Sequence, residues 1–279
     1  MRSGGNPIDV VVCHYNKSRS IHLRYMVLHT MAYLRKDHSQ NLNIVVVDGS
    51  PSGDETLARG LQNLGVKYLH GGRELSFAES YNAGIKETSN PVVVTLANDV
   101  FIEGAQIHRL AAEIRDRVGC AIPYLSSCDY GAQRARKLTP RRCYPTWMTL
   151  NVNAFSREVL QQVGLIPEQT SGCFNDVILF IKLRQKDYSI VLLNVGYVGH
   201  LGAQTLKSGS SSVSYTNDAL LFRKNFPQYW HRDGVLFHRV AQRLTTRMIY
   251  YLVEYLPLSR EKKTYLWEGV WAIEPYICT

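Results

Sequence analysis

The segment IDVVVC (residues 8–13) surrounds a single charged residue with β-branched residues. Such density is typical of a strand that is buried on both faces of a parallel sheet. The segments NIVVV (residues 43–47) and PVVVTL (residues 91–96) repeat the pattern. We therefore predict three buried strands in the N-terminal part of the chain.

Helical spacing of apolar residues fills the segments between these strands. It spans residues 21–34 and residues 54–64, and the second segment is preceded by Ser52, a candidate N-cap with Glu55 three residues on. An alternation of strands and helices predicts an α/β fold with a Rossmann-like, mostly parallel sheet flanked by helices. No internal repeat interrupts this order.

Length and composition set broad limits on the class of protein. With 279 residues, 45% of them hydrophobic, the chain is long enough for one large α/β domain and too ordinary for a disordered or fibrous protein. No run of about 18 uncharged apolar residues occurs, so we expect a cytoplasmic protein. The net charge of +9 implies an anionic partner, for which a nucleoside diphosphate, anionic lipid head groups and nucleic acid all qualify.

Polar residues follow each of the three predicted strands. Tyr15 and Asn16 follow the first, Asp48 closes the second, and Asn98 and Asp99 follow the third. The carboxyl ends of parallel strands share one rim, where ligands of such folds bind. Asp48 could accept hydrogen bonds from a base or ribose, and Asp99 could hold Mg²⁺ or Mn²⁺ together with phosphates. Spacing alone leaves an Asx-turn or helix cap for Asp48, and a plain strand-end turn for Asp99, as alternatives.

Several short motifs occur in a fixed order between about residues 8 and 226. They are VVVCHYNKS, VVVDGSPSG, ELSFAESYNAGI, LANDV, NVNAFSREVLQQVGLIPE and FNDVILFIKLRQKDYSIVLLNVGYVGHLG. In this order and spacing they resemble the family 2 glycosyltransferases, which share the GT-A fold and use nucleotide-sugar donors. LANDV is similar to the Asn-Asp variant of that family's DxD metal motif. The resemblance implies a GT-A catalytic domain.

The resemblance also implies a nucleotide site beside a metal site. The residues that it places around the nucleotide are His14, Tyr15, Asn16, Asp48, Arg73, Asn82 and Asn98. It implies that Asp99 and His200 hold a divalent cation, Mn²⁺ or Mg²⁺, with His200 binding through a neutral ring nitrogen. Alone, His200 would be read as a structural histidine beside a glycine turn. A UDP-sugar is the expected donor, because a uracil pocket is the family's commonest choice.

Asp176 falls where the family has its catalytic carboxylate. The resemblance implies a general base that takes the acceptor's hydroxyl proton while the oxygen attacks the anomeric carbon and inverts it. Local sequence offers a helix N-cap as the alternative, because the amphipathic run 177–183 follows. Two positions depart from the family pattern: Asn175 replaces the usual Glu, and Ile178 replaces a common acid.

Candidates for binding the acceptor or a phosphate lie mostly between the metal motif and Asp176. A dense basic segment consists of Arg134, Arg136, Lys137, Arg141 and Arg142. Its guanidinium groups could grip a diphosphate, a lipid-linked pyrophosphate or a nucleic-acid backbone, and a solvated loop is the alternative. Trp147 could stack on a sugar ring, and Asn151 and Asn175 are further candidates on the acceptor side.

The sequence changes character after a Ser/Gly-rich stretch near residues 207–214. We predict a GT-A catalytic domain over residues 1–212 and a helical, basic and aromatic extension over residues 213–279. Apolar and aromatic residues recur at helical spacing over residues 237–255, with arginines beside them. This helix could pack on the catalytic domain or touch an anionic membrane surface, and the aromatic tail could support a homodimer.

Together these features predict a metal-dependent, inverting glycosyltransferase. A glycan or lipid-linked glycan acceptor, in cell-surface polysaccharide or lipid-linked glycan synthesis, is expected by analogy alone, as is a place at the inner face of a membrane. One alternative is glycosylation of modified bases in nucleic acid, motivated by the net charge and the basic segment. Another is a non-catalytic nucleotide-sugar-binding scaffold, motivated by Asn175 and the thin acidic metal set.

Overall fold

The computed structural model describes residues 7–36, 41–127, 133, 135, 141–143, 148–202, 204, 213–231, 234–235 and 257. The strands are β1 (Ile8–His14), β2 (Leu42–Asp48), β3 (Lys67–His70), β4 (Val92–Ala97), β5 (Val100–Phe101), β6 (Val118–Pro123), β7 (Arg142–Cys143), β8 (Val152–Ser156), β9 (Ser189–Leu193), β10 (Gly199–His200), β11 (Trp230–His231) and β12 (Gly234–Val235). The helices are α1 (Ile21–Arg35), α2 (Glu55–Asn63), α3 (Phe77–Lys86), α4 (Gly104–Ala111), α5 (Arg157–Gln162), α6 (Asn175–Gln185) and α8 (Tyr215–Asn225), followed by a 3-10 turn, Pro227–Tyr229.

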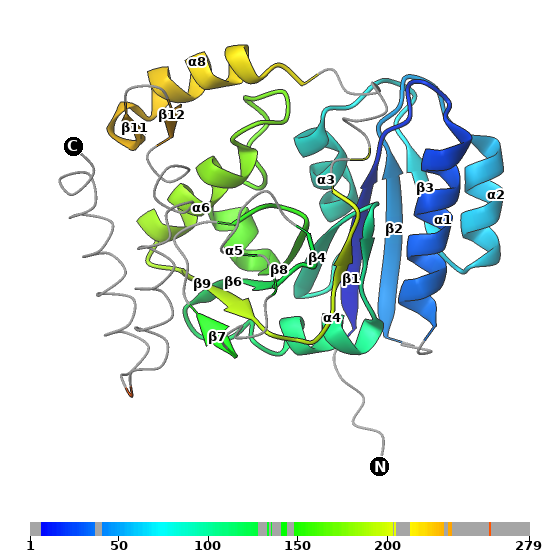
Figure 1. Ribbon diagram of the computed structural model, residues 1–279, viewed down its shortest axis with the longest axis horizontal. Coiled ribbons are helices and arrows are strands. Elements are labelled where there is room, and N and C mark those ends of the chain that lie inside the picture. Colours follow the sequence, from blue (N-terminus) through cyan, green and yellow to red (C-terminus); the bar gives the residue numbers. More distant parts are fainter. Residues whose placement is uncertain are drawn as a thin grey trace.

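The centre of the molecule is an eight-stranded sheet in the order β3-β2-β1-β4-β8-β6-β9-β7 (Figure 1). Parallel pairs join β1 to β2 and β4, β2 to β3, and β6 to β9. β8 lies antiparallel between β4 and β6, and β7 is antiparallel to β9. The mostly parallel α/β sheet is thus confirmed. The antiparallel strands were not predicted, because apolar periodicity does not encode strand direction.

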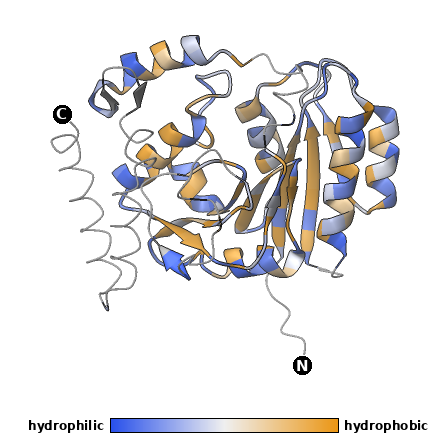
Figure 2. Ribbon diagram, in the orientation of Figure 1, coloured by the Kyte–Doolittle hydropathy of each residue, from blue (hydrophilic) through white to orange (hydrophobic). Residues whose placement is uncertain are grey.

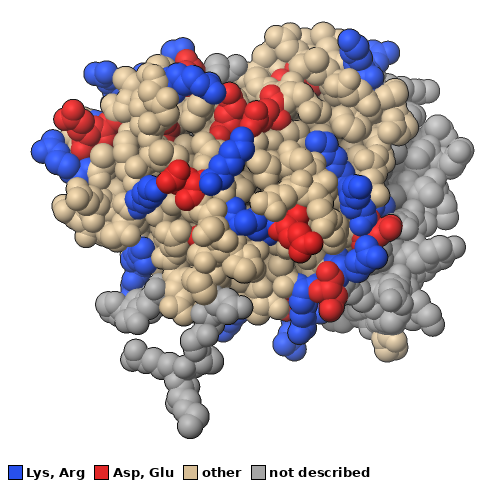
Figure 3. Space-filling model, turned by 180° about the vertical axis from the view of Figure 1, so that it is seen from behind, with Lys and Arg blue, Asp and Glu red and all other residues tan. Residues whose placement is uncertain are grey.

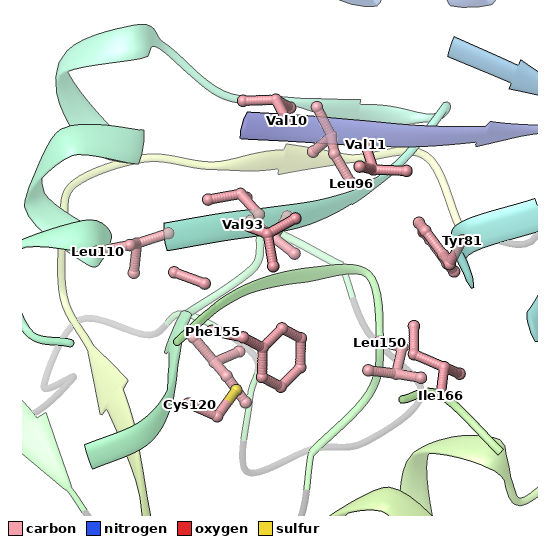
Figure 4. Close-up of a cluster of buried hydrophobic side chains, with 14 of the residues drawn as sticks. Val10, Val11, Tyr81, Val93, Leu96, Leu110, Cys120, Leu150, Phe155 and Ile166 are labelled. Carbon is pink, nitrogen blue, oxygen red and sulfur yellow. The ribbon is translucent and has the colours of Figure 1, made fainter. Parts of the chain in front are cut away.

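The core forms where the three predicted strands lie side by side. Val10, Val11 and Val12 of β1 are fully buried, and in Figure 2 the strands at the centre of the sheet are mostly orange, the colour of hydrophobic residues. Figure 4 shows part of this core, in which residues from β1, β4, β6, β8 and α3 meet. The side chains labelled there are Val10, Val11, Tyr81, Val93, Leu96, Leu110, Cys120, Leu150, Phe155 and Ile166. Their burial supplies the apolar area that stabilises the sheet.

Helices flank the sheet, and their starts follow local capping chemistry. The prediction of Ser52 as N-cap of α2 is wrong: Asp54 is the cap and accepts a hydrogen bond from Leu57 N at 2.9 Å. The Ser52 hydroxyl accepts instead from the Arg19 guanidinium at 3.0 Å. Asp54 also pairs with Arg24 at 2.7 Å, so this carboxylate ties α2 to α1.

Two further features concern the end of the chain. α8 lies above α6 in Figure 1, and its Phe222 ring stacks on Phe174 with centroids 5.1 Å apart. The helix predicted over residues 237–255 lies outside the described residues. Within the described part, no helix combines the length and the hydropathy that crossing a membrane requires.

Candidate functional site

The carboxyl ends of β1, β2 and β4 bring the predicted rim residues together. The β1–β2 register places His14 opposite Asp48. Asn98, which follows β4, has its amide nitrogen 3.0 Å from His14 Nδ1. Asn16 N donates to the Ser50 hydroxyl at 2.8 Å, which links the loops after β1 and β2. The three strand ends therefore form one continuous polar rim.

Asp48 is a buried carboxylate held by internal donors. Its Oδ2 accepts the Tyr68 hydroxyl at 2.7 Å, and its Oδ1 accepts both the backbone N–H of Ser50 at 3.0 Å and the Ser50 hydroxyl. The bond to the N–H two residues on is the Asx-turn contact that the turn interpretation predicts. Partial burial, together with the bond to Asp48, raises the pKa of Tyr68. Asp48 is thus rigidly placed, and its role toward a nucleotide stays a prediction.

His14 is fully buried at the centre of the rim. Burial lowers its pKa, while the nearby Asp48 and Asp54 act in the opposite direction. The ring is therefore neutral at pH 7. Because the Asn98 amide nitrogen faces Nδ1, the ring hydrogen belongs on Nε2, which has no hydrogen-bond partner among the described residues. His14 thus presents a buried polar atom beside the predicted nucleoside pocket.

Tyr15 and Arg73 lie at the outer edge of this rim. The Tyr15 hydroxyl donates to the Glu74 carboxylate. Arg73 is exposed and pairs with Glu79 at 2.8 Å, which lowers the pKa of Glu79. Glu79 also completes the capping box of α3. Arg73 is therefore placed by the start of α3, and its contact with a nucleotide stays a prediction.

The Asn82 side chain is hydrogen-bonded to the loop between α5 and α6. It is 3% exposed, and its amide nitrogen donates to Ile166 O at 2.8 Å and to Glu168 Oε1 at 2.7 Å. Its Oδ1 accepts from Ile166 N at 3.0 Å. These bonds join α3 to the segment that leads into α6. In the structure Asn82 therefore anchors the loop before Asp176.

The pairing of β5 with β10 brings Asp99 and His200 together. His200 lies opposite Val100 in this antiparallel pair, and Leu201 N donates to Asp99 O at 3.1 Å. His200 Nε2 is 3.5 Å from Asp99 Oδ1, and both side chains are 7% exposed. Residues that are about one hundred positions apart in the sequence thus form a buried pair at the end of β4.

The hydrogen on Nδ1 of His200 follows from its second contact. His200 Nδ1 lies 2.6 Å from Ser127 O, and a carbonyl oxygen can only accept, so Nδ1 carries a hydrogen. In the neutral ring Nε2 then turns its lone pair toward the Asp99 carboxylate. Two electron-rich atoms that face each other suit a shared cation, and a ligating histidine commonly donates its other N–H to a carbonyl. This donor set fits Mn²⁺.

A cation here would need further ligands. Across the described ranges of the chain, no group of three or more His, Cys, Asp or Glu side chains could hold a metal ion. Phosphate oxygens of a bound nucleotide are suitable hard ligands. The pair Asp99–His200 therefore fits an ion that binds together with a diphosphate.

Asp176 lies in the first turn of α6. The N-cap interpretation is wrong, because the N-cap is Phe174, which has the left-handed conformation (φ 64°). Asp176 Oδ1 accepts from Val177 N at 2.8 Å. Asp176 is only partly buried. Its desolvation raises its pKa to about 6, although this hydrogen bond acts in the opposite direction. A carboxylate with such a pKa is suited to accept a proton near neutral pH.

Asn175 has a structural use that the family's usual Glu could not serve. It is 1% exposed, and its amide nitrogen donates to Pro167 O at 2.6 Å. A carboxylate cannot donate this bond. Asn151 lies between β7 and β8. Its backbone carbonyl accepts from Ala97 N at 2.7 Å, and its side-chain amide donates to the Thr149 hydroxyl. Both asparagines thus support the loops around the site.

The basic segment is described only in part. Arg142 pairs with Glu113, and Arg141 O accepts from Asn194 N at 3.0 Å. Trp147 and the other members of the segment, Arg134, Arg136 and Lys137, lie outside the described residues. A phosphate contact for Arg141 or Arg142 stays a prediction.

Several residues that support the site are not indicated by the sequence. Ser127 orients His200 through its backbone carbonyl, which no side-chain motif announces. Thr30 in α1 places its hydroxyl 2.8 Å from Asn98 O. Tyr68 holds Asp48. Each of these contacts spans a long stretch of sequence, so local patterns carry no signal of them.

Comparison with known proteins defines the class. The model of the glycosyl transferase family 2 matches residues 9–174, more than half of the chain. The chain therefore belongs to this family of glycosyltransferases, and its mostly parallel sheet flanked by helices is the GT-A fold. No curated protein matches the sequence significantly.

Solved structures share this fold at low sequence identity. S. aureus TarS 1–349 in complex with UDP-GlcNAc has a TM-score of 0.57 and 16% identity over 91% of this chain and 74% of that chain. Mannosyltransferase PcManGT from Pyrobaculum calidifontis, in complex with GDP-Man and Mn²⁺, has a TM-score of 0.54 and 13% identity over 99% and 83%. GalNAc-T7 with UDP, GalNAc and Mn²⁺ has a TM-score of 0.52 and 17% identity over 71% of this chain, which spans 44% of the GalNAc-T7 chain.

Proposed function

We propose that this chain is a metal-dependent, inverting transferase that moves a sugar from a nucleoside-diphosphate sugar to an acceptor hydroxyl. The observation that carries the proposal is the buried pair of Asp99 and His200, 3.5 Å apart at the end of β4. The complexes of TarS with UDP-GlcNAc and of PcManGT with GDP-Man and Mn²⁺ support both the donor class and the cation.

Different residues of the site would serve different steps of such a reaction. Asp99 and His200 would hold the divalent cation, which supplies positive charge to the diphosphate. The rim formed by His14, Asn16 and Asp48 would receive the nucleoside, at the strand ends where such folds bind ligands. Asp176 would face the acceptor. UDP-sugars are the expected donors, with manganese or magnesium as the ion.

The proposed step conserves atoms and charge. The acceptor oxygen forms a bond to the anomeric carbon, while the bond from that carbon to the diphosphate oxygen breaks. The diphosphate leaves with the electron pair, and the acceptor's hydroxyl proton passes to the Asp176 carboxylate. With a pKa of about 6, Asp176 is roughly nine-tenths ionised at pH 7, so it is ready to take this proton. A single displacement inverts the anomeric centre.

A glycan or lipid-linked glycan is the acceptor class expected by analogy with the family. On the face drawn in Figure 3, Lys and Arg side chains are interspersed with Asp and Glu over the described part. A nucleic-acid surface would gather basic side chains into a patch or stripe. We therefore propose a role in cell-surface polysaccharide or lipid-linked glycan synthesis, by analogy with the family.

Thermal stabilisation by nucleotides tests the proposal. UDP, GDP, dTDP and CDP would each be added with Mn²⁺, Mg²⁺ or a chelator. One nucleotide should stabilise the protein only with metal, by about 2.7 kcal/mol at 100 times its dissociation constant. Asp99→Asn should lose this effect, whereas Asp187→Asn, at an exposed carboxylate after α6, should keep it. No stabilisation of a folded protein by any nucleotide would refute the proposal.

A further inference from the structure

A buried carboxylate on α8 receives hydrogen bonds from three consecutive backbone N–H groups. Asp218 is 2% exposed. Its Oδ1 accepts from Ser171 N at 2.7 Å, and its Oδ2 accepts from Gly172 N at 3.1 Å and from Cys173 N at 2.9 Å. The Ser171 hydroxyl adds a fourth bond, at 2.9 Å to Oδ2. Successive N–H groups of this kind form an anion-binding concavity, which Asp218 fills from the same chain.

Further contacts tie the same loop to α8. The Ser171 hydroxyl accepts from Ser214 N at 2.9 Å, and Ser214 is the N-cap of α8. A Cβ added at Gly172 would lie 2.5 Å from the Val213 side chain, so the Gly172 backbone packs closely against that side chain. Residues 213–218 thus hold the loop through both polar and apolar contacts.

The loop held in this way leads directly to Asp176. Phe174 follows it in the left-handed conformation, which costs a non-glycine residue roughly 1–2 kcal/mol. Its ring lies against Tyr215 and Phe222 of α8, with centroids 5.4 Å and 5.1 Å away. α6 begins at the next residue. The direction in which α6 starts, and therefore the place of the Asp176 carboxylate, depends on contacts from α8.

The loop is also held from the other side of the site. Asn82 of α3 bonds to Ile166 and Glu168, and the Asn175 amide bonds to Pro167 O. The segment between α5 and α6 is therefore fixed at its start by α3 and at its end by α8. Such fixed support is what a proton acceptor needs if it is to keep its geometry.

We propose that Asp218 is the positioning residue of the site: by holding the backbone of residues 171–173 it sets the place of Asp176 and limits the access of water to its carboxyl. α8 then belongs to the catalytic unit, although it lies beyond the boundary expected at residue 212. This inference rests on the proposed role of Asp176 as the base. Asp218 itself does not touch the substrate.

The substitution Asp218→Asn tests the role of the negative charge, because it removes the charge and keeps the shape of the side chain. Asp218→Asn keeps the size of the side chain, but its NH₂ group must face at least one backbone N–H of the loop, whichever way the amide turns. Ser171→Ala is a milder change that removes only the hydroxyl bonds. The matched control is Asp9→Asn. Asp9 is also a buried carboxylate that accepts four hydrogen bonds, but it lies near the start of β1, at the opposite end of this strand from His14 and the site.

Carbon-13 NMR titration of the Asp176 carboxyl, assigned with Asp176→Asn, is the decisive measurement, and amide hydrogen exchange of residues 171–173 accompanies it. In Asp218→Asn the pKa of Asp176 should fall from about 6 by at least about one unit toward its ordinary value of 3.8, because the displaced carboxyl becomes more exposed to water. Exchange in the loop should quicken at least about tenfold. Ser171→Ala should shift both quantities less, in the same direction, and decides the matter if Asp218→Asn fails to fold.

Two outcomes would overturn the inference. One is an Asp176 pKa and a loop exchange rate in Asp218→Asn that equal those of the wild type. The other is an equal shift in Asp9→Asn, which would reveal general destabilisation. Stabilisation by UDP with Mn²⁺ should be the same in Asp218→Asn as in the wild type. If UDP and the other nucleotides fail to stabilise even the wild type, the proposed function fails, whereas the carboxyl titration still decides what Asp218 does.

Discussion

Replacing Asp176 by asparagine should abolish transfer and yet stabilise the protein at neutral pH. Burial raises the pKa of Asp176 from 3.8 to about 6, so the folded state holds this proton more firmly than the unfolded state does. Between these two values the folded protein binds more protons, and the free energy of unfolding falls as the pH rises. The penalty is absent below about pH 4 and fully present above about pH 6.

The size of the effect follows from the shift. A rise from 3.8 to about 6 corresponds to roughly 3 kcal/mol of penalty for the ionised form. Asparagine removes this penalty and keeps an oxygen that can accept from Val177 N. It also loses the favourable interaction of a carboxylate with the first turn of α6, about 0.3–1 kcal/mol. The net gain should be about 2 kcal/mol at pH 7, or roughly 4 °C in Tm for a chain of this size.

Thermal unfolding of the wild type and of Asp176→Asn between pH 4 and pH 8 measures this gain. The difference in Tm should be small at pH 4 and should reach its full size above pH 6. Asp187→Asn is the control and should show no such trend, because its carboxylate is exposed. An Asp176→Asn protein that is no more stable than the wild type at pH 7 would show that desolvation does not destabilise the ionised form of Asp176.

Three further substitutions test packing and hydrogen bonding, each by urea unfolding. Asn175→Asp should cost about 1–3 kcal/mol, because a carboxylate would face Pro167 O, 2.6 Å from the present amide nitrogen. Arg157→Met should cost about 3–5 kcal/mol, because it leaves the fully buried Asp9 without its cation. Gly84→Ala should cost about 1–3 kcal/mol, because the added methyl would lie 2.2 Å from a valine side chain of β1. A loss below about 0.5 kcal/mol at any of these positions would contradict the contact assigned to it.

The sequence predicted those parts of the fold that depend on local pattern. The valine-rich runs of β1, β2 and β4 require burial on both faces, and each strand was predicted to within one residue of its bounds. The start of α2 was misplaced because Ser52 and Asp54 are both good caps by type. Asp54 is also paired with Arg24 of α1, a contact that the local sequence does not indicate.

The site was predictable where it lies on strand ends. The positions of Asp48 and Asp99 follow from parallel strands whose carboxyl ends share a rim. The approach of His200 to Asp99 needed the family resemblance, because the β5–β10 pair has only two residues in each strand. The bonds from Asp218 to residues 171–173 join segments with no common motif, so nothing in the sequence indicated them.

In the proposed function, Asp99 and His200 share a divalent cation with a nucleoside diphosphate. Pulsed electron paramagnetic resonance of Mn²⁺, bound together with the nucleotide that stabilises the protein best, tests it most directly. The spectrum should show coupling to one imidazole nitrogen in the wild type, and His200→Gln should remove that coupling. Mn²⁺ that binds with the nucleotide but shows no nitrogen coupling, or the same coupling in His200→Gln, would show that His200 is not a ligand of the cation.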